Sequence, residues 1–212
     1  MKSPELIRAL ANDLTPVRPG KTRNDLLVGL GLGAVVSIVL VLVIYGVQPD
    51  LLSIARGGPM AMKVCYALLL TAIAGSMLMP MLRPGDRVLD RRKLFATLMV
   101  LLGGLALWQT TTSDTDTVSL WLGLTWQRCS LRIAGLSVPV FAGACWAIRR
   151  QAPLRLRATG ALAGLVSGGI AATVYTLACE EGGAGFVLVW YTLGIAISTA
   201  FGAITGPYLL RW

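Results

Sequence analysis

The stretch LLVGLGLGAVVSIVLVLVIY, residues 26–45, decides the fold class, because it holds twenty successive residues without a charge. A helix needs about 20 mostly apolar residues to cross the roughly 30 Å hydrocarbon core of a bilayer. The whole chain shares this character, since its 212 residues are 55% hydrophobic and 14% charged, with a mean hydropathy of +0.70. Water-soluble domains of this size are much less apolar. The sequence therefore predicts a membrane protein.

Five further apolar runs follow, so we expect an all-α membrane protein with six transmembrane helices. The predicted spans are residues 26–45, 61–79, 94–108, 131–148, 158–178 and 186–205. Short connections between them favour three helical hairpins. Two domains result: a cytoplasmic N-terminal segment, residues 1–25, and a six-helix transmembrane domain, residues 26–212.

Lysine and arginine indicate the orientation, because cytoplasmic loops retain them. Fifteen of the 19 basic residues lie in the N-terminal segment, in the second and fourth connections or at the C-terminus. Both termini are therefore predicted to be cytoplasmic, and the net charge of +9 is interpreted as a topology signal rather than as a nucleic-acid footprint. No span centre holds an ionisable residue, and Lys63 and Arg132 are close enough to span ends to extend to the membrane surface.

The N-terminal segment MKSPELIRALANDLTPVRPGKTR, residues 1–23, predicts a short amphipathic helix that ends at Pro16. Its apolar face is formed by Leu6, Ile7, Leu10, Ala11 and Leu14. A helix of about 12 residues is marginal alone in water, so it should fold against something. Two interpretations stay open: the helix lies on the membrane surface, or it docks a soluble partner.

Glycines in the apolar runs predict close helix packing. GLGLG, residues 29–33, lies inside a span and follows no strand, which argues against a dinucleotide site. Small residues recur every fourth position in the last two spans, at Gly160, Gly164, Gly168 and Ala172, and at Gly194, Ser198, Gly202 and Gly206. Because such spacing lets backbones approach, the last hairpin should be a tight pair.

Cysteines are the most informative reactive side chains, since the chain has no histidine and therefore lacks Ser-His-Asp and Cys-His catalysis. Cys65 and Cys145 fall inside spans and are expected to act as small buried hydrophobes. Cys129 and Cys179 each fall at the outer end of a span, in a compartment where disulfides persist. Their charged neighbours are Arg128, Glu180 and Glu181. The two thiols could form a disulfide, bind a soft metal, or do neither.

Three function classes remain. A regulatory or sensory bundle with a docking helix fits the N-terminal helix and the outer thiols. A small transporter or metal permease is the alternative, although transporters commonly bind substrate at a polar midplane, which this sequence lacks. A thiol oxidoreductase is weaker because no CxxC motif is present. We therefore expect no enzyme activity and no cofactor.

Several motifs in order along the chain carry a resemblance to a known family. They are ELIRALANDLTPVRP (5–19), QPDL (48–51), WQRCS (126–130), ATVYTLACEE (172–181), VWYTLGIA (189–196) and GPYLLRW (206–212). Together they make the chain similar to the NrsF family, membrane-bound negative regulators of sigma factor F.

The resemblance implies an anti-sigma factor of the bacterial inner membrane. Such a protein holds an extracytoplasmic-function sigma factor inactive until heavy-metal or oxidative stress reaches the outward cysteines, here Cys129 and Cys179. The sigma-binding positions that it implies are Leu6, Ile7, Leu10, Asp13, Leu14, Pro16, Val17 and Arg18. The chain has no large soluble domain for the partner, so the N-terminal helix and the basic loops must hold it.

Overall fold

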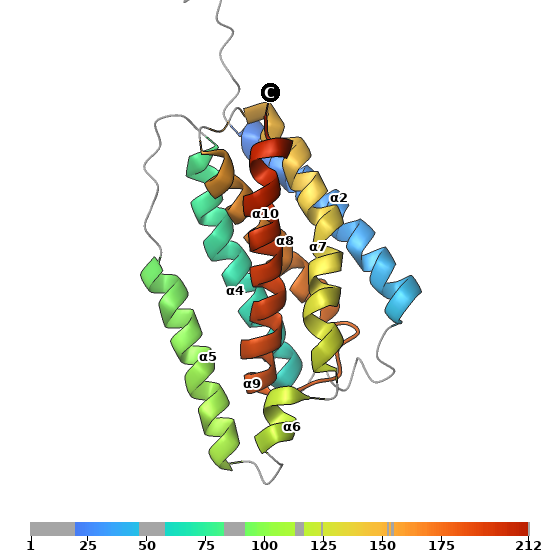
Figure 1. The fold of residues 1–212 in the computed structure, drawn as a ribbon, viewed down its shortest axis with the longest axis vertical. Helices are drawn as coiled ribbons and strands as arrows, with labels where there is room; N and C mark the ends of the chain where they lie inside the picture. The colour runs from blue at the N-terminus through green and yellow to red at the C-terminus, as the bar shows by residue number, and fades with distance from the viewer. Residues whose placement is uncertain are drawn as a thin grey trace, which may run out of the picture.

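The structure, a computed structural model, describes residues 20–46, 58–82, 92–112, 117–123, 125–151, 153 and 155–211, and within these ranges every regular element is helical (Figure 1). The α-helices are α2 (Lys21–Leu40), α4 (Gly58–Met81), α5 (Arg92–Thr112), α6 (Thr117–Leu122), α7 (Trp126–Ile148), α8 (Leu156–Tyr175), α9 (Ala184–Phe186) and α10 (Thr192–Leu209). Two π-helical turns, η1 (Val41–Tyr45) and η3 (Val187–Tyr191), extend α2 and precede α10, and the 3-10 turn η2 (Arg149–Gln151) follows α7.

Six helical segments are long and apolar enough to cross a membrane, which confirms the predicted number of such helices. They are Lys21–Tyr45, Gly58–Met81, Lys93–Thr112, Leu120–Gln151, Leu156–Tyr175 and Ala184–Leu209. The residues predicted to bind a sigma factor, from Leu6 to Arg18, lie outside the described part of the chain.

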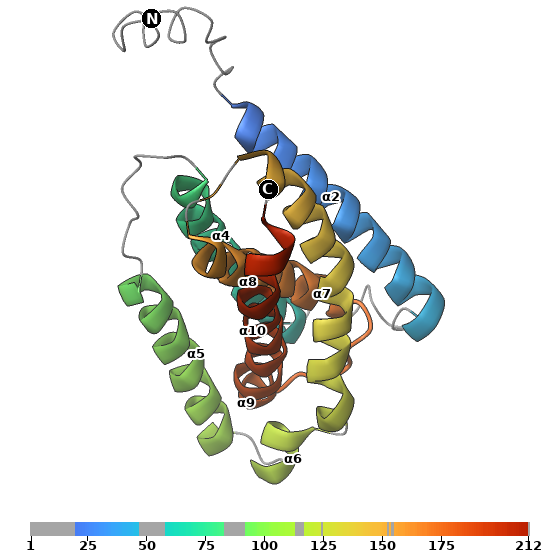
Figure 2. The ribbon, with the colours of Figure 1, turned by 45° about the horizontal axis from the view of Figure 1, so that its top comes forward.

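The six segments run alternately up and down, so the bundle has two chemically distinct ends. One end carries the start of α2 and the ends of α7 and α10 (Figures 1 and 2). There, Thr22 Oγ1 donates to Gln151 Oε1 at 2.7 Å, and Arg149 Nε donates to the carbonyl of Leu209. We call this the basic end. The opposite end carries α6, α9 and the residues around Cys129 and Cys179, and we call it the thiol end.

Helix α8 lies at the centre of the bundle and packs against α4, α7 and α10. Its contact with α10 is backbone to backbone: a Cβ built on Gly202 would lie 3.1 Å from Gly164 Cα, and one on Gly206 would lie 2.8 Å from the Leu156 carbonyl oxygen. The last two spans are therefore a tight pair, as their small residues predict.

The first span does not follow the simple hairpin arrangement. Helix α2 packs along α7, not primarily along its neighbour α4. Gly33 is close enough that a Cβ there would lie 2.5 Å from Val140 Cα, and Ser37 Oγ donates to the Leu136 carbonyl at 2.8 Å. The outer two glycines of GLGLG, Gly29 and Gly33, thus serve packing, but between helices far apart in sequence. Of the three predicted hairpins, only the last pairs its own two helices closely, because α2 packs mainly on α7 and α5 packs mainly on α9, η3 and α4 rather than on α7.

Two helix boundaries differ from the prediction in ways that shape the candidate site. Helix α7 begins at Trp126 rather than at residue 131, so Cys129 lies inside its first turns. Helix α8 ends at Tyr175 rather than at residue 178, so Cys179 lies in the connection between α8 and α9. The residues from 176 to 179 are buried or half-buried against neighbouring helices without continuing the α-helix.

Candidate functional site at the paired thiols

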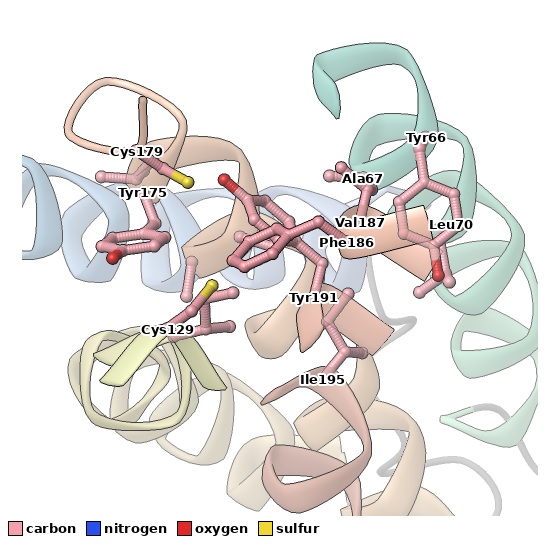
Figure 3. Close-up of a cluster of buried hydrophobic side chains, with 14 of the residues drawn as sticks. Tyr66, Ala67, Leu70, Cys129, Tyr175, Cys179, Phe186, Val187, Tyr191 and Ile195 are labelled. Atoms are coloured by element: carbon pink, nitrogen blue, oxygen red, sulfur yellow. The ribbon is translucent and has the colours of Figure 1, made fainter. Parts of the chain in front are cut away.

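The structure brings the two predicted outer cysteines together at the thiol end. Cys129 and Cys179 are 0% and 2% exposed, both are free thiols, and their side chains hydrogen-bond to each other. Figure 3 shows the two sulfurs directed toward the same space. Burial and adjacency mean that each sulfur's nearest reaction partner is the other sulfur.

The turn that carries Cys179 is held by a buried cation. Lys63, in the first turns of α4, is 2% exposed, and its Nζ donates to the Cys179 carbonyl at 2.7 Å. The expectation that Lys63 extends to the membrane surface is therefore wrong. Its side chain turns inward because a carbonyl that has left the helix pattern needs a donor, and the ammonium supplies one.

Glu181 joins the Cys179 turn to the start of α7. Its Oε1 accepts hydrogen bonds from the Thr125 backbone nitrogen at 3.1 Å and from Thr125 Oγ1 at 3.3 Å. A carboxylate at a helix N-terminus also complements the helix dipole. Gly123, at φ 62, leaves room for this carboxylate, since a Cβ there would lie 2.7 Å from Glu181 Cδ. Of the accessory candidates, Glu181 is thus part of the site, whereas Glu180 and Arg128 are exposed.

Two buried tyrosine rings lie beside the sulfurs, and a third ring packs on one of them (Figure 3). Tyr175 and Tyr191 are buried, with ring centroids 6.2 Å apart, and Tyr175 also meets Tyr45 at 6.3 Å. The guanidinium of Arg132 lies over the Tyr45 ring, 4.7 Å from its centroid, and Arg132 Nη1 donates to the Tyr175 hydroxyl at 3.4 Å. Tyr45 and Tyr191 both belong to π-helical turns, which widen a helix locally and are frequent at functional sites.

Electrostatics distinguishes the two thiols. The hydrogen bond from Cys129 lowers the pKa of the Cys179 thiol below its ordinary value, and the positive charge of Lys63 acts in the same direction against burial, which raises it. Cys179 is therefore the more readily ionised of the two sulfurs. Nucleophilic attack starts from a thiolate, so the pair has one attacking and one resolving member.

Metal binding has less support from the side chains present. Within the described ranges, no group of three or more cysteine, aspartate or glutamate side chains is placed to hold a metal ion. Two thiols fall short of the four ligands of a structural zinc site.

The remaining cysteines are unrelated to this site. Cys145 is buried, as expected. Cys65 is exposed, so its expected burial is wrong: it lies on the outer face of α4, two residues from the inward-turned Lys63.

Sequence reasoning missed Lys63, Arg132, Tyr175 and Tyr191. Arg132 follows Cys129 by three residues, a helical spacing that places both on neighbouring faces, so this one could have been found. Lys63 is more than a hundred residues from Cys179, and no local pattern connects the two.

Comparison with known proteins identifies the family of this chain. The family described as "Negative regulator of sigma F", NrsF, matches residues 10–212, a range that contains every residue of the site. The chain belongs to the NrsF family. It is 36% identical to the "Anti-sigma-F factor NrsF" of Caulobacter vibrioides and 35% identical to the "Probable anti-sigma-F factor NrsF" of Azospira oryzae, and each match covers 100% of both chains. No solved structure matches the chain.

Membership in the NrsF family agrees with the resemblance drawn from the sequence motifs. The family and both curated relatives are named as regulators, which is consistent with a protein that is not an enzyme.

Proposed function

We propose that this NrsF-family protein is an inner-membrane anti-sigma factor that sequesters an extracytoplasmic-function sigma factor and releases it when its paired thiols react. The names of the relatives support the sigma-factor partner. The observation that carries the sensing role is the direct contact between Cys129 and Cys179, buried and reduced, at the end of the bundle away from most basic residues.

The proposed topology puts the basic end in the cytoplasm. Most of the described basic residues gather there: Lys21, Arg23, Lys93, Arg149, Arg150, Arg155, Arg157 and Arg211. Retention of Lys and Arg on the cytoplasmic side then places the thiol pair outside and both termini inside. Sensing and partner binding are thereby on opposite sides of the membrane.

The partner contact is proposed at the N-terminal segment, residues 1–25, with Leu6, Leu10 and Leu14 on the docking face. This segment continues directly into α2, and α2 packs by its backbone on α7, the helix that carries Cys129. A change in the first turns of α7 therefore has a continuous physical route along the α2–α7 contact to the docking segment at the other end of the bundle.

Two kinds of stress fit the pair: an oxidant that joins the sulfurs, and a thiol-reactive heavy metal. The absence of a third ligating side chain among the described residues favours the oxidant. Release requires only a coupling of about 1–3 kcal/mol between the thiols and the docking segment.

Co-purification tests this function. The protein, tagged at its C-terminus, is recovered from solubilised membranes of its native host, and bound proteins are identified by mass spectrometry. We expect one sigma factor, lost when Leu6, Leu10 and Leu14 are changed to Ser, and released by hydrogen peroxide from the parent but not from the Cys129→Ser/Cys179→Ser variant. Peroxide release from the double variant would refute thiol sensing.

A small transporter remains the alternative function. Recovery of no soluble partner, together with saturable uptake of a metal ion into liposomes, would replace the anti-sigma proposal by that one.

A further inference from the structure

Lys63 is a cation buried next to two thiols, and the function proposed above assigns it no role. It is 2% exposed, and the acidic groups around it are Cys179, Cys129 and Glu181. On α7, the other cation near the pair is Arg132, which is engaged with Tyr175 and Tyr45. On η3, Tyr191 places its hydroxyl toward Cys179.

A buried ammonium needs a counter-charge, because an unpaired charge away from water is among the costliest features a protein can hold. Glu181 directs its carboxylate oxygen Oε1 to Thr125, so it is already occupied in part by the start of α7. The carbonyl that accepts the Lys63 hydrogen bond belongs to Cys179, so the thiolate of that residue is a counter-charge in the same turn.

We propose that Lys63 converts oxidation of the thiol pair into movement: when Cys129 and Cys179 form a disulfide, the negative charge of Cys179 disappears, the Lys63 ammonium keeps only the partly engaged Glu181 carboxylate as a counter-charge, and the cation leaves its site with the first turns of α4. This inference rests on the proposed function, since it names the residue through which the thiol signal acts. Lys63 is a positioning residue in the reduced state and the displaced group in the oxidised state.

The chemical step balances with hydrogen peroxide as the two-electron oxidant. The Cys179 thiolate attacks one peroxide oxygen, the O–O bond breaks, and hydroxide leaves, so that Cys179 becomes a sulfenic acid. The Cys129 sulfur then attacks the Cys179 sulfur, the S–O bond breaks, and the Cys129 proton leaves with that oxygen as water. Two sulfurs are oxidised, peroxide is reduced, and one negative charge moves from the protein to hydroxide.

Helix α4 is suited to pass this movement on. It packs tightly on the central helix α8, where a Cβ on Gly169 would lie 3.3 Å from Thr71 Cβ and 3.4 Å from the Ala67 carbonyl oxygen. These contacts lie one to two turns from Lys63 on the same helix. A shift of the first turns of α4 therefore acts on α8, which in turn contacts α7 and α10.

The test measures hydrogen exchange of the first turns of α4, residues 58–66, in the full-length protein in lipid nanodiscs before and after hydrogen peroxide. Cys65 and Cys145 are replaced by Ser, so that a maleimide gel shift reports only the disulfide between Cys129 and Cys179. Three variants are compared with this parent: Lys63→Met, which removes the charge; Lys63→Arg, which keeps it; and Arg128→Gln, which removes an exposed cation one residue from Cys129.

We expect oxidation to speed exchange in residues 58–66 by roughly fivefold or more in the parent, in Lys63→Arg and in Arg128→Gln. In Lys63→Met the disulfide should form while exchange in this segment changes by less than about twofold, because no charge is stranded. A parent that forms the disulfide without faster exchange overturns the inference, and so does a Lys63→Met variant that opens as the parent does. Rescue by arginine separates the charge from a merely structural role.

Failure of the proposed function gives a different result. If the parent opens at α4 on oxidation but retains or never binds a sigma factor, the anti-sigma mechanism fails while the role of Lys63 stands. If the sigma factor is released from Lys63→Met as readily as from the parent, with the disulfide formed in both, the role of Lys63 fails while thiol sensing stands.

Discussion

Changing Gly33 to Ala should separate α2 from α7, because the atoms in its way are backbone atoms that cannot rotate aside. The added Cβ would lie 2.5 Å from Val140 Cα, 2.6 Å from the Pro139 carbonyl oxygen and 2.9 Å from the Val140 nitrogen. Ordinary contact begins at 3.4 Å, so the two helices must part by about 1 Å. That displacement also stretches the 2.8 Å hydrogen bond from Ser37 Oγ to the Leu136 carbonyl.

The cost follows from these two effects. Overpacking of a close contact costs about 1–3 kcal/mol, and loss of one hydrogen bond between membrane helices adds about 0.6 kcal/mol, for a total of about 2–4 kcal/mol. For a chain of this length, about 1 kcal/mol corresponds to about 2–4 °C, so the melting temperature in detergent should fall by about 4–16 °C. Tryptophan fluorescence during heating measures it.

Gly31→Ala is the matched control, since a Cβ at Gly31 meets nothing within 4 Å. This change removes a helical glycine without a clash and should leave the melting temperature unchanged or raise it slightly, by the equivalent of about 0.5–1 kcal/mol. Equal losses in the two variants, or a Gly33→Ala protein that melts within about 2 °C of the parent, would refute the assignment of α2 to α7.

Three further outcomes are expected. Because the pKa of Cys179 is lowered, its iodoacetamide labelling rate should fall less between pH 9 and pH 7 than that of a cysteine peptide, and Cys129→Ala should move this profile to higher pH; a peptide-like profile in the parent contradicts this reasoning. Ser37→Ala should lower stability by about 0.6 kcal/mol, measured as a small drop in the melting temperature. Glu181→Gln should speed hydrogen exchange at residues 125–130 severalfold by weakening the bonds to Thr125, while Glu180→Gln, at an exposed position, should not.

Sequence alone predicts the number of membrane-length helices, because each span is a continuous local signal. It also predicts the tight packing of α8 on α10, since both members of that pair carry the same four-residue spacing. Residues that end helices are harder to place: the apolar run to residue 178 gives no sign that α8 stops at Tyr175.

Partners across the bundle are not readable from one sequence. Nothing in the sequence around GLGLG predicts that Gly33 contacts Val140. The burial of Lys63 can likewise be recognised only in the folded chain, where its ammonium meets the Cys179 carbonyl. A lysine near the end of a span can either extend to the membrane surface or turn inward and bind a carbonyl, and the local sequence is the same in both cases. Tertiary contact decides between them.

The pairing of α2 with α7 also sets an order of assembly during synthesis. Ser37 and its acceptor Leu136 are 99 residues apart, so α2 enters the bilayer and waits there while most of the bundle is still being made. During that interval the glycine face of α2 can contact only lipid, because α7 is not yet made. Association of the two helices is then a separate stage that follows their insertion. Under the proposed topology and function, the segment ahead of α2 thus reaches the cytoplasm before the thiol-bearing helix exists, and a nascent chain would bind its partner before it is able to release it.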